Sequence, residues 1–354
     1  MLWITVIIGA LIPSIALVYF IHQIDRFKEP TSHMVMAFIA GLLSPILTLI
    51  FSAHFNLGLS AASHPWLYAL SMAALPEELG RMVILYLICS KWEEVGEPFD
   101  CLVYGATIWA GFAATENVLY ALNEIKQENN PVILLAIRAS LCTMGHTAWG
   151  VIMGAYVALA RFCTQNKSDH WLIKGLFITV MLHLLYDGLL FSVSSGQMIL
   201  KMSGALFVDA FSLILAGVYL IRMRAIQGVA DSEGDELLLQ TELFKRHAPD
   251  SSASVLELFK QMHITGIFKV LLAMTLSSLG FGLLLYSLGE LEWMLIPLGA
   301  GALVFGLLAW RSVLRVAYLA HKETSAELER EIKEARKKKR RRFTLPWRVR
   351  KDDS

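Results

Sequence analysis

The stretch "ALPEELGRMVIL", residues 74–85, places Glu77, Glu78 and Arg81 inside an otherwise apolar run of membrane length. An ionised carboxylate at the centre of a bilayer costs roughly 2.5 kcal/mol or more, so such residues are functional candidates. Two carboxylates in a low-dielectric site cannot both ionise cheaply, and one of them then holds a proton while the other stays charged. The pair therefore predicts a base that removes a proton from water, so that the water can attack a carbonyl carbon.

Other polar side chains interrupt the apolar segments further along the chain. They are Glu116, Asn117, Arg138, His146, His183, Asp187 and Asp209. Imidazoles and a carboxamide can donate hydrogen bonds to a developing oxyanion or shuttle protons. Arg81 follows the two glutamates at helical spacing and can pair with either of them, and His183 and Asp187 share a helix face. Neither GxSxG nor HExxH occurs in the sequence, which argues against serine and zincin peptidase chemistry.

The segments that carry these residues have the composition of membrane spans. Of the 354 residues, 56 % are apolar and only 17 % are charged, a balance rare in soluble domains. Since about 20 apolar residues cross the hydrocarbon core, the sequence predicts an all-α polytopic membrane protein with about nine transmembrane helices. The predicted spans are 2–22, 33–53, 66–89, 99–122, 132–160, 171–192, 202–221, 265–287 and 292–318.

The distribution of lysine and arginine predicts the orientation of these spans. The basic run Arg336–Arg342 belongs on the cytoplasmic side, and nine spans then put the N-terminus outside. The short loops alternate in basic content as this orientation requires. Counted along each helix from the outer face, the intramembrane carboxylates and imidazoles fall between the outer quarter and the middle of the membrane. We therefore expect them to form one site that opens toward the outer face.

The chain divides into four predicted parts. Residues 1–224 form a seven-span catalytic core, 225–263 a cytoplasmic loop, 264–319 an appended two-span module, and 320–354 a basic cytoplasmic tail. The tail is expected to lie against anionic lipid headgroups. Nucleic-acid binding is not predicted, because the sequence offers no folded reading surface for it.

Four motifs occur in order between residues 74 and 190: "PEELGR", "FDCLVYGATIWAGFAATENVLY", "GHTAWG" and "HLLYD". In these the chain resembles the PrsW family of intramembrane glutamic proteases, within the superfamily of CAAX-prenyl proteases and bacteriocin-processing proteins. The resemblance implies an endopeptidase of the bacterial cytoplasmic membrane. Its implied partner is a membrane-anchored protein substrate, such as an anti-sigma factor, cleaved near the extracytoplasmic side.

The resemblance also implies roles for particular residues. Those implied as catalytic are Glu77, Glu78, Glu116, His146 and His183, and those implied to orient them or to support the oxyanion are Arg81, Asn117 and Asp187. Two features depart from the family pattern. Arg81 stands where lysine is more frequent, and the last two spans with the basic tail exceed the usual core.

The same residues are compatible with three further functions. Two histidines with a glutamate and an aspartate are reasonable ligands for zinc, which would make the protein a metal-dependent protease. Glu77 and Glu78 cannot both point at one ion from a regular helix, so we predict catalysis without a metal or other cofactor. Intramembrane carboxylates and histidines are equally typical of an ion or proton transporter, and a non-enzymatic membrane scaffold is the third possibility. The sequence does not determine the substrate, the scissile bond or the oligomeric state.

Overall fold

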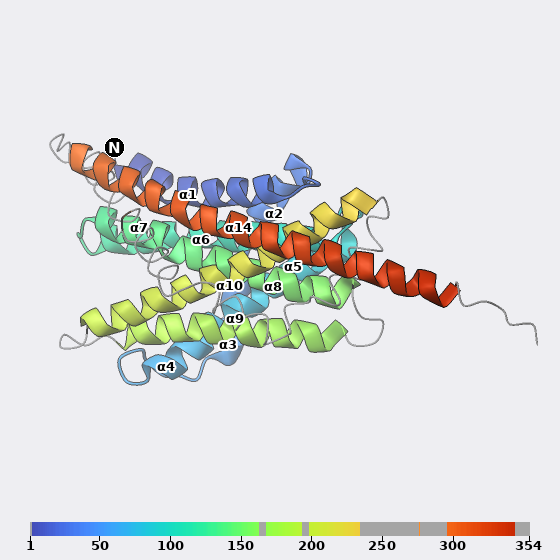
Figure 1. Cartoon of the computed structure of the whole chain (residues 1–354). Helices are drawn as coiled ribbons and strands as arrows, with labels where there is room; N and C mark the ends of the chain where they lie inside the picture. The colour runs from blue at the N-terminus through green and yellow to red at the C-terminus, as the bar shows by residue number, and fades with distance from the viewer. Residues whose placement is uncertain (1, 163–167, 193–197, 234–275, 277–295, 344–354) are drawn as a thin grey trace, which may run out of the picture.

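The computed structural model describes residues 2–162, 168–192, 198–233, 276 and 296–343 (Figure 1). Within these ranges the chain is built of helices and contains no β-strand, as predicted. The elements are α1 (Leu2–Ile24), α2 (Thr31–Leu43), α3 (Pro45–Phe55), α4 (Pro65–Tyr68), a π-helical turn (Ala69–Ala74), α5 (Leu75–Lys91), α6 (Pro98–Lys126), α7 (Pro131–Ser140), α8 (Cys142–Phe162), α9 (Ser168–Phe191), α10 (Met198–Glu233) and α14 (Ile296–Phe343).

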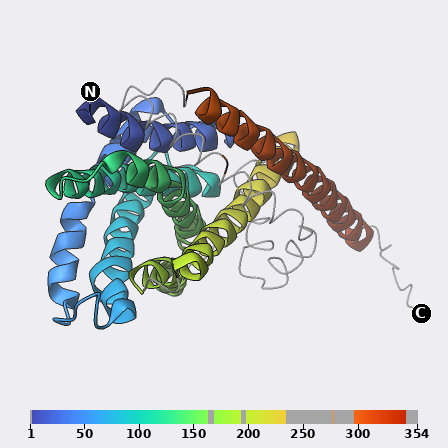
Figure 2. The same ribbon diagram turned by 90° about the vertical axis from the view of Figure 1, so that its left-hand side faces the viewer.

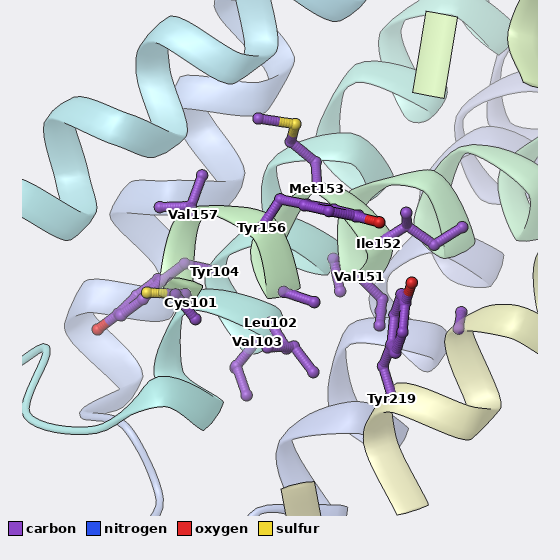
Figure 3. Close-up of a cluster of buried hydrophobic side chains, with 14 of the residues drawn as sticks. Cys101, Leu102, Val103, Tyr104, Val151, Ile152, Met153, Tyr156, Val157 and Tyr219 are labelled. Carbon is purple, nitrogen blue, oxygen red and sulfur yellow. The ribbon is translucent and has the colours of Figure 1, made fainter. Parts of the chain in front are cut away.

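Helices α6 and α8 form the centre of the bundle, and they are buried on nearly every side. Glycines let their backbones touch: a Cβ on Gly105 would lie 2.2 Å from the carbonyl oxygen of Gly150, and one on Gly150 would lie 2.4 Å from that of Gly105. Small residues at such crossings allow close packing of membrane helices. Figure 3 shows part of the apolar core, to which α6, α8 and α10 contribute. This contact fixes how side chains of α6 meet those of α8.

The outer helices expose large apolar side chains. Ile12 on α1 is 52 % exposed and Leu49 on α3 is 70 % exposed, with many others like them. Because an apolar exterior of this extent suits hydrocarbon and not water, the surface is that of an integral membrane protein. Four segments among the described residues are long and apolar enough to cross a membrane: Val6–Ile24, Thr31–Phe55, Asp169–Phe191 and Leu200–Gly228.

These segments correspond to predicted spans one, two, six and seven. Predicted spans three, four and five coincide with α4–α5, α6 and α7–α8, which carry most of the intramembrane ionisable groups. Predicted span eight, 265–287, falls almost wholly outside the described residues. The count of nine and the orientation of the termini therefore stay predictions.

Three predicted spans are less regular than single helices. Ser44 separates α2 from α3, which begins at Pro45, and Leu141 separates α7 from α8. In span three the N–H of Leu75 bonds to the carbonyl of Leu70, which closes a π-helical turn directly before Pro76. Pro76, in the first turn of α5, has no N–H to continue the α-helical pattern, and a proline at this position is typical of such an interruption.

Helix α10 continues through residue 224 to Glu233, so the first part of the predicted 225–263 loop is helical. The amphipathic stretches of that loop lie outside the described residues. Helix α14 packs along α10 and continues without interruption from predicted span nine into the basic tail. Its 48 residues span about 72 Å at 1.5 Å per residue. Figure 2 shows its C-terminal part extending beyond the other helices.

Candidate active site

Arg81 is the centre of a buried polar cluster. Its Nη2 lies 2.7 Å from Glu78 Oε1 and 3.3 Å from Glu77 Oε2, and its Nη1 lies 3.1 Å from His146 Nδ1. The guanidinium also lies over the ring of Phe112, with 3.8 Å between Cζ and the ring centroid. The side chain is fully buried. Arg81 thus pairs with both glutamates, as their helical spacing predicts, and links α5 to α8.

Glu78 is held by donors from three helices. Oε1 accepts from Arg81 and lies 3.1 Å from His183 Nδ1, while Oε2 accepts from Trp109 Nε1 at 2.9 Å. Its side chain has no exposed surface. A carboxylate with this many partners is fixed in position, and it in turn orients Arg81 and the imidazole of His183.

Glu77 is held more loosely than its neighbour. Its contacts run through Oε2, which lies 3.3 Å from Arg81 and 3.8 Å from His183 Nε2. Among the described residues no hydrogen bond reaches Oε1, and 12 % of the side chain is exposed. Of the two glutamates, Glu77 is therefore the one with an oxygen available to water.

His146 connects Arg81 to a second ion pair. Because a guanidinium N–H can only donate, His146 Nδ1 accepts from Arg81, and the ring proton lies on Nε2. That nitrogen is 2.9 Å from Glu116 Oε2, and the other oxygen of Glu116 lies 2.8 Å from Arg138 Nη2. The chain Arg81, His146, Glu116, Arg138 fixes the imidazole in one tautomer.

His183 lies between carboxylates. Its Nδ1 faces Glu78, and its Nε2 lies 3.2 Å from Asp187 Oδ2, the partner predicted from the four-residue spacing. The ring stacks on Trp149, with centroids 4.5 Å apart. A doubly protonated imidazole donates to both carboxylates, and its Nε2 also lies 3.8 Å from Glu77 Oε2.

Asn117 lies at the edge of the cluster. Its Oδ1 accepts from Arg138 Nε at 3.2 Å, and its Nδ2 donates to Thr143 Oγ1 at 3.0 Å. Both ends of the amide are therefore engaged away from the two glutamates, and the side chain orients Arg138. The structure thus brings together Glu77, Glu78, Arg81, Glu116, His146, His183 and Asp187, with Asn117 beside them.

Sequence reasoning did not assign site roles to Trp109, Trp149 and Arg138. Trp109 precedes Glu116 by two helical turns, so a count along that helix face could have found it. Arg138 was visible as an isolated charge in an apolar segment, yet its partner Glu116 lies on another helix. Trp149 had no signal beyond its place in the motif that contains His146. Asp209 is buried against Gly145, and neither of its oxygens has a hydrogen bond among the described residues.

The cluster also has the donor set of a metal site. Glu77, His146 and His183 are all buried, and each offers one ligand atom within 4.8 Å of the others. Two imidazoles and one carboxylate are a common zinc set, and the bond from His183 Nδ1 to Glu78 resembles the outer support of metal-bound histidines. The residues therefore fit such an ion. In the structure, however, Arg81 bonds to two of the three, Glu77 and His146.

A helical bundle with a lipid-facing apolar exterior and a buried cluster of carboxylates and imidazoles defines a polytopic membrane protein with a candidate hydrolytic site. Comparison with known proteins agrees with this class. The model of the family described as "PrsW family intramembrane metalloprotease" matches residues 29–218, more than half of the chain. The chain belongs to the PrsW family of intramembrane proteases.

Individual relatives match about half of this chain and most of their own length. Protease PrsW of Geobacillus kaustophilus is 31 % identical over 179 residues, which are 50 % of this chain and 76 % of that protein. Protease PrsW of Halalkalibacterium halodurans is 30 % identical over 185 residues, 51 % and 81 % respectively. Protease PrsW of Bacillus subtilis is 27 % identical over 191 residues, 54 % and 84 %. No solved structure matches the chain.

Proposed function

We propose that the protein is an intramembrane endopeptidase in which Glu77 activates water for attack on a peptide bond. The observation that carries this proposal is the difference between the two glutamates. Glu78 is fully buried and has a donor for each oxygen, whereas Glu77 is partly exposed and has one oxygen without a hydrogen bond among the described residues. Glu77 is the carboxylate that can bind a water molecule.

The reaction proceeds in two proton transfers. Glu77 removes a proton from water as the oxygen attacks the peptide carbonyl. The resulting tetrahedral oxyanion accepts a hydrogen bond from the Nε2–H of His183, which Asp187 then shares with the oxyanion. His183 suits this role because its Nε2 lies 3.8 Å from Glu77 Oε2, on the side of the reacting atoms. Glu77 then returns the proton to the amine nitrogen as the C–N bond breaks.

The remaining residues position these two. Arg81 and Glu78 hold Glu77 and His183, and Asp187 holds the second nitrogen of His183. His146, held by Glu116, fixes Arg81 from the opposite side. Fixed dipoles and charges of this kind stabilise a transition state without having to reorganise.

The proposed substrate is a membrane-anchored protein, such as an anti-sigma factor, cleaved near the extracytoplasmic side of a bacterial cytoplasmic membrane. The motif resemblance to the family and the names of the relatives support a protease in a membrane. The predicted topology, with the N-terminus outside and the basic tail on anionic cytoplasmic headgroups, puts the reacting layer toward the outer face.

A second candidate is a metal-dependent protease, favoured by the grouping of Glu77, His146 and His183 and by the description of the family as metalloproteases. These three residues would hold the ion, which would lower the pKa of a bound water and polarise the carbonyl. We favour the metal-free form because Arg81 already supplies a positive charge to Glu77 Oε2 and His146 Nδ1.

The test is cleavage of candidate single-span proteins by the purified protein in lipid nanodiscs. We expect Glu77→Gln to remove cleavage, and we expect wild-type cleavage to persist after treatment with a chelator. Loss of activity with chelator and its return with zinc would establish the metal-dependent form. Proton flux in substrate-free liposomes that Glu77→Gln removes would indicate a transporter instead.

A further inference from the structure

A second group of buried acidic side chains lies far from the candidate active site. Asp25 follows α1, and Glu97 and Asp100 open α6; they are 2 %, 7 % and 2 % exposed. Each offers one oxygen within 4.8 Å of the others. Asp100 and Glu116 are both on α6, and their separation corresponds to about 24 Å of helical rise. The two clusters are therefore separate sites.

The protein holds one oxygen of each aspartate by hydrogen bonds. Asp100 Oδ2 accepts from the backbone N–H groups of Gly96 and Glu97, at 2.7 and 2.8 Å. Asp25 Oδ1 accepts from the Phe27 N–H at 3.1 Å and from Gln227 Nε2 at 2.9 Å. These contacts fix both carboxylates in one orientation.

Gln227, on α10, joins the group together. Its Nε2 also donates to Glu97 Oε1, so one amide bridges Asp25 and Glu97. The cluster thus lies where the end of α1, the start of α6 and the last turns of α10 meet, and it is built by residues distant in the sequence.

The other oxygen of each aspartate has no such partner. Asp25 Oδ2 is buried and receives no hydrogen bond from the described part of the chain, and there Asp100 Oδ1 has no N–H or hydroxyl donor, although its carboxyl group interacts with that of Glu29. Glu29 adds a fourth carboxylate beside Asp100 and accepts from the hydroxyl of Tyr104. Arg224 interacts electrostatically with Asp25 and Glu97.

Three buried carboxylates that lie this close together need a positive charge to compensate them. An all-oxygen set is the ligand type of hard cations and not of zinc or copper. Oxygens up to 4.8 Å apart can both contact one ion, since calcium ligands lie about 2.4 Å from the metal. Arg26 and Gly96, the chain neighbours of Asp25 and Glu97, are exposed, so the cluster lies just beneath the protein surface.

We propose that Asp25, Glu97 and Asp100 bind a hard divalent cation, Ca²⁺ or Mg²⁺, that ties the ends of α1, α6 and α10 together. The ion takes one oxygen from each of the three carboxylates, and water completes its coordination. Its role is structural, and it acts on a part of the bundle that the peptidase chemistry does not use.

The test uses the full chain in nanodiscs of neutral lipid, stripped with a chelator and then titrated with Mn²⁺, whose binding is followed by electron paramagnetic resonance. We expect Asp100→Asn and Asp25→Asn to weaken one class of bound Mn²⁺ by at least about tenfold. Asparagine keeps an oxygen for the backbone and Gln227 donors, so the local fold is retained. Ca²⁺ or Mg²⁺ should displace the same Mn²⁺ and raise the thermal unfolding midpoint of the wild type.

Two variants serve as controls for the binding measurement. Glu93→Gln changes an exposed acid in the same loop and should bind as the wild type does. Glu77→Gln should also retain this Mn²⁺ class, which separates it from any ion at the active site. A wild-type midpoint that neither Ca²⁺ nor Mg²⁺ moves, or Mn²⁺ binding equal in the wild type and both aspartate variants, overturns the proposal. The carboxylates would then be neutralised by shared protons.

Discussion

Substituting each of the two adjacent glutamates by glutamine should separate stability from catalysis. In Glu78→Gln, the amide NH₂ must face either the Trp109 indole N–H or the donors of Arg81 and His183. One buried donor is then left unsatisfied, at about 1–3 kcal/mol. Arg81 also loses its 2.7 Å partner, and breaking a buried ion pair from one side costs about 3–5 kcal/mol. We expect Glu78→Gln to lower the free energy of unfolding by roughly 3–5 kcal/mol.

Glu77→Gln should instead have little effect on stability and a large effect on turnover. Among the described residues, the donor within hydrogen-bond distance of the Glu77 side chain is Arg81 at 3.3 Å, and the glutamine oxygen can keep that contact. The loss of stability should therefore be about 1 kcal/mol or less. Removing a general base, in contrast, lowers turnover by about 10²–10⁴-fold.

The assay pairs thermal unfolding in nanodiscs with turnover of a cleavable single-span substrate, normalised to the folded fraction. Turnover per folded molecule should fall further in Glu77→Gln than in Glu78→Gln. The assignment of Glu77 as the base is refuted if Glu77→Gln retains more than about a tenth of wild-type turnover, well above the range for loss of a base. Equal thermal midpoints for the two variants would refute the structural role given to Glu78.

Packing and charge lead to three further predictions. Gly150→Ala places a Cβ 2.4 Å from a backbone oxygen of α6 and should cost about 1–3 kcal/mol, whereas Gly217→Ala, with open space around it, should be neutral or stabilising by thermal unfolding. Arg138→Met leaves Glu116 without its 2.8 Å partner and should lower kcat more than it changes KM, with partial rescue by Arg138→Lys. Because burial raises the pKa of Asp25, the charged carboxylate is disfavoured in the folded state. The free energy of unfolding of the wild type should therefore fall as the pH rises above 3.8, the ordinary pKa that Asp25 has in the unfolded chain. In the presence of a chelator, Asp25→Asn should therefore be more stable than the wild type at neutral pH and equal to it below that value, as measured by chemical unfolding.

Much of the candidate site could be predicted because a charged side chain is costly inside a membrane. Charged residues within apolar spans therefore indicate functional positions. The pairing of Arg81 with both glutamates followed from helical spacing, and so did the pairing of His183 with Asp187. The shared membrane layer was counted from the ends of the spans. The structure brings these residues into contact, except Asp209, which has no hydrogen bond to the cluster among the described residues. The oxyanion role implied for Asn117 could not be tested by spacing, because its amide partners, Arg138 and Thr143, lie on other helices.

The irregularities of the helices were only partly predictable. Pro76 signalled a break, but the π-helical turn before it depends on how the chain packs against its neighbours. The ends of α10 and α14 extend beyond the apolar segments, since a helix continues past the membrane when its polar residues favour helix. Hydropathy predicts the apolar segment that crosses the membrane, but it does not predict how far the helix extends beyond that segment.

By itself the sequence determined the helical membrane class, the family motifs and the pairs within single helices, because these depend on composition and on the fixed rise and turn of a helix. Only the tertiary structure decided which glutamate is held and which is available. That difference comes from donors on other helices: Trp109 on α6 and His183 on α9 engage Glu78 and leave one oxygen of Glu77 without a hydrogen bond among the described residues. The grouping of Asp25, Glu97 and Asp100 with Gln227 likewise could not be predicted from the sequence, since contacts between residues more than a hundred positions apart leave no local sequence pattern.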